Sequence, residues 1–138
     1  MLTLCHDVDI HASKAVVYKA VTTSAGFNAW WTVACKGELS LGKIFSFYFS
    51  DDYDWKAEVV ECIPDHKVVY RIIHADEDWT GTLLSFELIE KSQGNIILRF
   101  EHQNWQNIND HYRRTNYCWA KYFLQLKKFV ESTETANK

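Results

Sequence analysis

The residues of this chain with the clearest potential for binding chemistry are its aromatic side chains, because six Trp, seven Tyr and eight Phe make up 15% of the sequence. Inward-pointing rings could line an apolar cavity, with indole N–H and tyrosine O–H groups orienting a ligand. The same rings could instead fill the core, since a buried ring typically covers roughly 150–250 Å². Strand parity and helical phase predict a pocket-lining set of Trp30, Phe47, Trp55, Tyr70, Phe86, His102, Trp105, Tyr112 and Trp119.

Two members of this set, His102 and Tyr112, could also do acid–base chemistry. His102 ends the inner face of a predicted strand, and Tyr112 follows near the start of a long predicted helix. A histidine beside a tyrosine at the mouth of a cavity could bind a polar group of a ligand, or act as an acid or base. The alternative is a hydrogen-bonded structural histidine. We assign no catalytic residue.

Other reactive side chains form no recognisable site. The histidines and cysteines lack the spacing of zinc ligands, and no GxSxG, GxGxxG or Walker sequence is present, so we expect neither a metal nor a cofactor. The N-terminal residues MLTLCHDVDI do not resemble a signal peptide, which predicts a cytoplasmic protein with reduced thiols. We expect Cys118, next to Trp119, to be a buried, inert thiol.

The charge of the chain restricts its partners. A net charge of −3 and a pI of about 6.0 argue against a general binder of nucleic acids or anionic membranes, and no apolar run is long enough to span a membrane. The acidic segments 51–54 and 76–78 could dock a basic partner or form solvated hairpin turns. Arg113 and Arg114 could bind a carboxylate or remain surface charges.

The long C-terminal segment, residues 109–131, predicts the helix that organises the fold. Tyr112, Asn116, Trp119, Phe123, Leu126 and Val130 follow one another at steps of three or four and form one mostly apolar stripe. Such a stripe needs a large apolar surface to lie on. We expect residues 1–138 to form a single domain, with 132–138 as a frayed tail.

The residues before this helix predict the surface that it covers. Ser13 is a good N-cap for a short helix at 14–22, and the small residues 23–26 separate it from a second around 27–31. Seven strands joined mostly by short turns should form a curled antiparallel sheet, with a pocket wherever sheet and helix diverge. The strands are predicted at 2–10, 37–41, 43–50, 55–60, 68–72, 80–89 and 96–102.

This order of elements resembles the START-like superfamily, also called SRPBCC or helix-grip. A closer resemblance is carried by VYKAV at 17–21, Trp30-Trp31, Gly37 to Phe49, Trp55, Glu61, Pro64, WTGT at 79–82, Phe86, HQNW at 102–105, Tyr112, Trp119 and Leu126-Lys127. With these residues the chain resembles the family related to the C-terminal domain of the activator of the heat-shock-protein-ninety ATPase. It departs from that family's pattern at Ser13, Lys14 and Asn104.

The resemblance implies an α+β helix-grip fold and a role in binding a hydrophobic or aromatic small molecule between sheet and helix. Co-regulation of a chaperone ATPase through the surface, in a stress response, is an alternative. A cyclase- or hydrolase-like enzyme that uses the same cavity is another, although a non-enzymatic binding module is favoured. The implied partners are a hydrophobic small molecule or a chaperone, and the implied assembly is a monomer or a homodimer.

Overall fold

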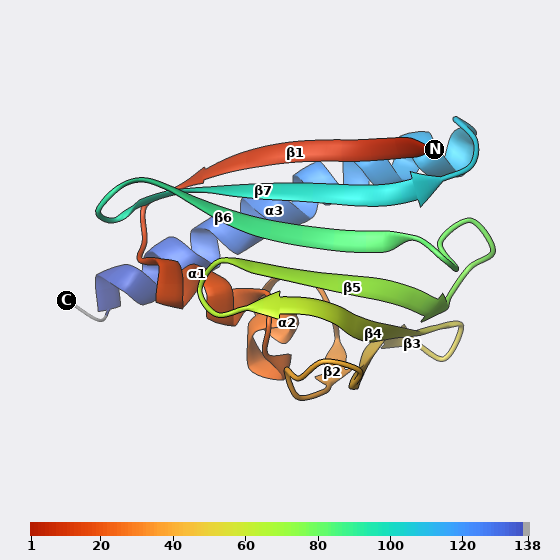
Figure 1. The fold of residues 1–138 in the computed structure, drawn as a ribbon, viewed down its shortest axis with the longest axis horizontal. Coiled ribbons are helices and arrows are strands. Elements are labelled where there is room, and N and C mark those ends of the chain that lie inside the picture. The colour runs from red at the N-terminus through yellow and green to blue at the C-terminus, as the bar shows by residue number, and fades with distance from the viewer. Residues whose placement is uncertain (137–138) are drawn as a thin grey trace.

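A seven-stranded antiparallel sheet and a long C-terminal helix dominate the computed structural model, which describes residues 1–136 (Figure 1). Two short helices lie between the first and second strands, so the predicted α+β helix-grip fold is confirmed. The elements are β1 (Leu2–Ile10), α1 (Lys14–Ala20), α2 (Ser24–Trp30), β2 (Ala34–Lys36), β3 (Ile44–Ser50), β4 (Tyr53–Ile63), β5 (Lys67–His74), β6 (Leu83–Ser92), β7 (Asn95–Trp105) and α3 (Asp110–Ala136).

The sheet is a meander that the first strand joins at its far side. Strand order is β1-β7-β6-β5-β4-β3-β2, so strands β2 to β7 each pair with their neighbours in sequence and β1 pairs with β7. Irregularities in register occur in β4, between Val59 and Glu61, and at other points of the sheet. Such bulges bend a strand and increase its twist, which curls the sheet around the helix.

The two short helices begin at side-chain caps that the sequence provides. The Ser13 hydroxyl accepts a hydrogen bond from the Val16 N–H, and the Thr23 hydroxyl accepts one from the Gly26 N–H. Gly26 lies inside α2 rather than in the break between helices. A Cβ atom there would lie 2.5 Å from the Lys19 carbonyl oxygen, so glycine allows α2 to pack against the end of α1.

Two predicted strand boundaries are wrong. Residues 37–41 form no strand, and β2 lies just before them at Ala34–Lys36. A Cβ atom at Gly37 would meet the Phe45 ring at 2.5 Å, so the chain crosses close above that ring. The strand expected at 80–89 begins only at Leu83, because Gly81, with φ +90°, lies in a turn.

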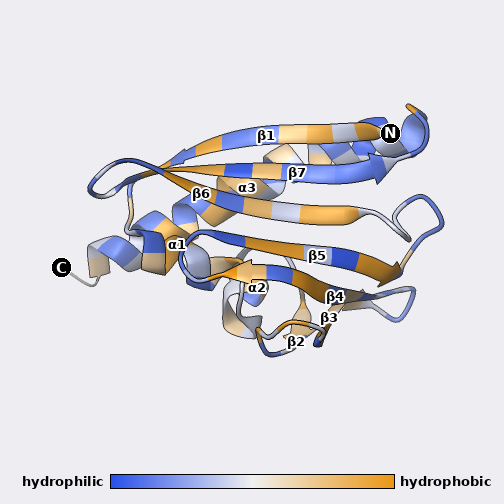
Figure 2. Cartoon of the chain, in the orientation of Figure 1, coloured by the Kyte–Doolittle hydropathy of each residue, from blue (hydrophilic) through white to orange (hydrophobic). Residues whose placement is uncertain are grey.

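The long helix α3 covers the concave face of the sheet. Its buried residues are Thr115, Trp119, Phe123, Leu126 and Val130. Asn116, which we expected in the buried stripe, is exposed, and its side-chain oxygen lies 2.9 Å from His6 Nε2 on the edge strand β1. Hydrophobic and hydrophilic residues alternate along the strands, as expected for a sheet with one covered face (Figure 2).

Aromatic rings fill the interior between the sheet and the helices. Phe27 of α2 is fully buried and lies within 6.4 Å, centroid to centroid, of the rings of Phe45, Phe47 and Tyr70, among others. The Tyr70 hydroxyl donates to the Val21 carbonyl at 2.6 Å. The middle of the sheet is therefore closed by close-packed core, and any pocket must lie towards one end.

Among the described residues, no helix is long and apolar enough to cross a membrane.

Candidate ligand pocket

An open pocket of about 650 Å³ lies at the end of the molecule where α3 begins. It is enclosed by the C-terminal end of β3, the N-terminal end of β4, the β5–β6 loop, the residue after α2 and the first half of α3. Its volume falls in the range typical of small-molecule sites, roughly 300–1,000 Å³. The lining residues are Trp31, Phe49, Tyr53, Trp55, Asp76, Asp78, Trp79, His111, Arg114, Thr115, Cys118, Trp119 and Tyr122.

Five aromatic rings of this lining form a closed cycle in which each ring contacts the next. The successive centroid distances are 5.3 Å from Trp31 to Phe49, 5.0 Å to Trp55 and 4.5 Å to Trp79. The cycle closes through Trp119, at 5.7 Å from Trp79 and 5.1 Å from Trp31. All five separations are those of favourable aromatic pairs. The pocket is therefore bounded by a continuous aromatic wall contributed by five separate segments of the chain.

The β5–β6 loop places Trp79 in this wall. The Trp79 N–H donates to the Asp76 carbonyl at 3.0 Å, and the Thr82 N–H donates to the Trp79 carbonyl at 2.9 Å. Gly81 takes the positive φ that this turn requires. Trp79 is only 5% exposed although it belongs to a loop, because it stacks on Trp119.

A chain of buried hydrogen bonds lies behind the wall and fixes two of its indoles. Trp119 Nε1–H donates to His102 Nδ1 at 3.1 Å, which requires the proton of the neutral imidazole to be on Nε2. That proton is directed to Thr82 Oγ1 at 2.9 Å, and the Thr82 hydroxyl donates to the Trp79 carbonyl at 2.5 Å. Trp79 Nε1 lies 3.4 Å from Thr115 Oγ1.

His102 is therefore a structural group rather than a ligand contact. It is fully buried, and both ring nitrogens have partners. Burial, with a smaller contribution from the charge of His111, lowers the pKa of His102 from its ordinary 6.5 to about 3. The ring stays neutral at physiological pH, in the tautomer that accepts from Trp119.

The mouth of the pocket carries charged groups. His111 Nδ1 and Asn109 Nδ2 lie 3.0 and 3.4 Å from the same oxygen of Asp78, Oδ2. Asp76 is half-buried, and within residues 1–136 its carboxylate has no hydrogen-bond or ion-pair partner. Arg114 is exposed and likewise forms no ion pair there. The described residues hold no cluster of His, Cys, Asp and Glu suited to a metal ion.

The structure places the nine predicted pocket residues in three groups. Trp55 and Trp119 line the pocket. His102, Trp105 and Tyr112 lie behind it, with the Trp105 ring between the other two at 5.1 and 5.3 Å. The remaining four are core residues that do not line the pocket, although two of them contact Trp31 of the wall. They are Trp30, Phe47, Tyr70 and Phe86.

Sequence reasoning missed three rings of the wall, Trp31, Phe49 and Trp79. Phe49 shares its strand face with Phe45 and Phe47, so parity alone could have included it. A tryptophan in an otherwise acidic turn, as at Trp79, was a second usable signal. Cys118 was expected to be buried, but it is exposed and lies at the pocket.

A curled antiparallel sheet that holds a C-terminal helix, with a pocket at one end of the interface, defines the START-like class of proteins. The chain belongs to the family described as Activator of Hsp90 ATPase homolog 1-like protein, whose model matches residues 11–131. No curated protein matches the chain in a sequence comparison.

Solved structures agree with this assignment. The Aha1 dimer from Colwellia psychrerythraea is 32% identical, with a TM-score of 0.85 over 95% of this chain and 97% of that one. A protein from Mesorhizobium loti is 18% identical, with a TM-score of 0.83 over 96% and 98% of the two chains. A Bacillus halodurans protein is 20% identical, with a TM-score of 0.78 over 95% and 98%. The last two similarities concern the fold.

Proposed function

We propose that the protein is a non-enzymatic binding module that holds a hydrophobic or aromatic small molecule in the pocket at the start of α3. The observation that carries this proposal is the closed cycle of five mutually contacting aromatic rings in the lining of an open volume of about 650 Å³. Apolar pockets of this size with a few polar groups at the mouth are typical of small-molecule sites.

Tryptophan fluorescence provides the direct test. Trp31, Trp55, Trp79 and Trp119, four of the six tryptophans, line the pocket, so a bound aromatic probe should quench most of the emission. A ligand that binds only the native state also raises the melting temperature, in proportion to the logarithm of its concentration. A broad screen of apolar ligands that changes neither signal would contradict the proposal.

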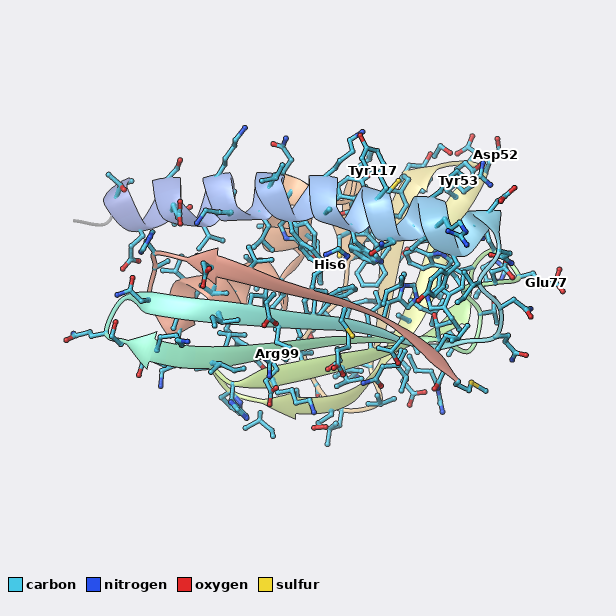
Figure 3. The ribbon with its side chains drawn as sticks, turned by 90° about the horizontal axis from the view of Figure 1, so that it is seen from above. His6, Asp52, Tyr53, Glu77, Arg99 and Tyr117 are labelled. Atoms are coloured by element: carbon cyan, nitrogen blue, oxygen red, sulfur yellow. The ribbon has the colours of Figure 1, made fainter. Side chains whose placement is uncertain are left out.

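Two exposed tyrosines provide a matched pair of variants. Tyr53 lines the pocket and is 48% exposed, whereas Tyr117 is 66% exposed and lies on the outer side of α3 (Figure 3). Tyr53→Ala should weaken binding about fivefold, since one aromatic contact contributes roughly 1 kcal/mol. Tyr117→Ala should leave the dissociation constant unchanged. Equal effects of the two substitutions would place the ligand outside this pocket.

Membership of a family named for the activator of the Hsp90 ATPase supports a second candidate function, co-regulation of that ATPase through the surface of the protein. This function predicts a change in the ATPase rate of the cognate chaperone when the protein is added. The same Tyr53→Ala and Tyr117→Ala variants distinguish the two candidates, since a surface interaction at α3 would depend on Tyr117. An unchanged ATPase rate at saturating protein would remove this candidate.

The third alternative, a cyclase- or hydrolase-like enzyme, depended on convergent polar groups inside the cavity, with His102 or Tyr112 among them. Both residues lie outside the pocket lining, and both nitrogens of His102 bond to protein groups. Nothing in the pocket replaces it with a nucleophile held beside a base, because Cys118 is exposed and has no hydrogen-bond partner among the described residues. The binding module is therefore the better-supported function.

The cellular setting that we propose is the cytoplasm, with residues 1–138 acting as one domain. Four free cysteines, two of them exposed, fit a reducing compartment. The relative from Colwellia psychrerythraea is described as a dimer, which supports a homodimer over a monomer for this chain. Light scattering on a size-exclusion column would decide between them, and a monomer mass at micromolar concentration would reject the dimer.

A further inference from the structure

We propose that the pocket selects an organic cation, a hydrophobic or aromatic body that carries an ammonium group. The proposal rests on the proposed function and names the chemical class of its ligand. It depends on two independent features, the aromatic rings of the wall and the acidic residues around the mouth.

The acidic residues are concentrated at the pocket. Six of the 18 Asp and Glu residues lie in segments 51–54 and 76–78, and neither segment contains Lys or Arg. These segments form the two hairpin tips that contribute Tyr53, Asp76 and Asp78 to the lining. Asp52 and Glu77 lie at the same end of the molecule as the start of α3 (Figure 3). Charge of one sign around a cleft raises the local concentration of ligands of the opposite sign.

Some of these acids already have partners and others do not. Lys56 pairs with Asp54 at 2.7 Å, and His111 lies 3.0 Å from Asp78. The half-buried carboxylate of Asp76 has no partner within residues 1–136, although it lines the pocket. An ammonium group at the mouth would supply the missing hydrogen-bond donor, and bonds to charged groups are stronger than those between neutral groups.

The aromatic wall favours the same ligand class. The faces of tryptophan rings carry negative charge density and attract cations within about 6 Å of the ring centroid. Two of the four pocket indoles, those of Trp79 and Trp119, use their N–H groups inside the protein and are stacked on each other, so they offer the ligand no hydrogen-bond donor. Trp55 is the more exposed indole of the wall, because it is only half-buried. A wall of this kind suits the body of an organic cation.

One group at the pocket favours the opposite charge. Arg114 is exposed at the mouth and could pair with an anionic ligand. Arg113, the next residue, is exposed too, but it does not line the pocket. Among residues 1–136, Arg114 is thus the one lysine or arginine in the lining, against two carboxylates, and its contribution can be measured separately.

The test compares three probes of equal length that differ in charge, phenylbutylamine, phenylbutanol and phenylbutanoate, by isothermal titration with the full chain. We expect the amine to bind about tenfold more tightly than the alcohol, and the carboxylate to bind most weakly. The preference for the amine should fall as salt is raised, because the acidic groups at the mouth are partly exposed.

Matched variants identify the carboxylate. Asp76→Asn should remove most of the preference for the amine while leaving the affinity for the alcohol within about twofold. Glu90→Gln changes an exposed acid on β6 that does not line the pocket and should leave all three affinities unchanged. Melting curves confirm that each variant is folded. A preference for the amine that survives Asp76→Asn would overturn the role assigned to Asp76.

The remaining outcomes separate this inference from the proposed function. Equal affinities for all three probes would overturn the selection of cations and leave the apolar pocket intact. Tightest binding of the carboxylate, lost in Arg114→Gln, would overturn it in favour of anions. Failure of all three probes to bind at millimolar concentration would count against both the selection of cations and the proposed function.

Discussion

Protonation of His102 should destabilise the protein in mild acid, and the structure sets the size of the effect. The side chain is fully buried, accepts a hydrogen bond from Trp119 and donates one to Thr82. A proton added to Nδ1 would place a charge in the core and remove the acceptor of the Trp119 N–H. Burial therefore keeps the pKa of His102 at about 3 in the folded state.

The direction in which pH changes the free energy of unfolding follows from the protons bound by the folded and unfolded states. In the unfolded chain the His102 pKa returns to about 6.5, so between pH 6.5 and about 3 the unfolded state binds a proton that the folded state excludes. The contribution of the neutral His102 to the free energy of unfolding is fully present above pH 6.5 and is lost as the pH falls towards 3. With 1.36 kcal/mol per pH unit, the free energy of unfolding should fall by about 2 kcal/mol between pH 7 and pH 5 through this residue alone.

Urea denaturation followed by tryptophan fluorescence measures this loss. The free energy of unfolding is extrapolated to water at several pH values between 5 and 8 for the wild type and for His102→Gln. The variant is expected to be less stable at pH 7, by about 1–3 kcal/mol, because a buried hydrogen-bond partner is lost. Its stability should then depend less on pH, so that the gap between the two proteins narrows by about 2 kcal/mol at pH 5.

The exposed His74 provides a matched control, since His74→Gln also removes one imidazole. His102→Gln is expected to reduce the dependence of stability on pH, and the control measures the effect of losing an imidazole from the surface. A gap between the wild type and His102→Gln that stays constant from pH 7 to pH 5 would refute the buried neutral imidazole. An imidazolium NMR signal from His102 at pH 5 in the folded protein would do the same.

Three further substitutions test the packing by the same denaturation assay. Gly26→Ala should lower the free energy of unfolding by about 1–3 kcal/mol, because the added Cβ would lie 2.5 Å from the backbone carbonyl oxygen of Lys19. A variant as stable as the wild type would contradict that close contact. Leu126 is fully buried on α3, so Leu126→Ala should leave a cavity and lower the free energy of unfolding by about 2–5 kcal/mol. A smaller loss would mean that neighbouring side chains move in and fill the cavity. Arg99→Ala should cause no measurable change, because its ion pair with Asp7 is exposed.

The sequence predicts the elements of this fold well where the signal is local. The cap at Ser13, the alternation of Phe45, Phe47 and Phe49, and the helical stripe that includes Trp119 all arise from backbone periods that hold regardless of what lies opposite. These signals and the family resemblance were sufficient for the element order and the helix-grip architecture.

The errors occur where a distant contact decides the structure. Residues 37–41 have an alternating pattern, but the close approach of Gly37 to the Phe45 ring ends β2 before them. In α3, Thr115 rather than Asn116 is buried, because α3 runs beside β1 and Asn116 there faces His6. Neither contact can be recognised from residues adjacent in sequence.

The same reasoning explains why the pocket was only partly predicted. Parity identifies rings that point inward, but it does not say how far along the sheet the covering helices extend. Phe47 and Tyr70 point inward where Phe27 covers them, and they are core. Phe49 is one step further along the same strand face as Phe47, beyond that cover, and it lines the pocket.

Three of the four pocket tryptophans, Trp79, Trp119 and Trp55, differ in whether their N–H groups are bonded inside the protein. Trp79 and Trp119 direct their N–H groups to Thr115 and His102, so each is part of both the pocket wall and the buried hydrogen-bond chain. Trp55 is half-buried and makes no such bond among the described residues. Trp119→Phe should therefore lower stability, by about 1–3 kcal/mol, together with ligand affinity, whereas Trp55→Phe should change affinity and leave stability nearly unchanged. Parallel losses of stability in both variants would mean that the hydrogen-bond chain does not support the wall.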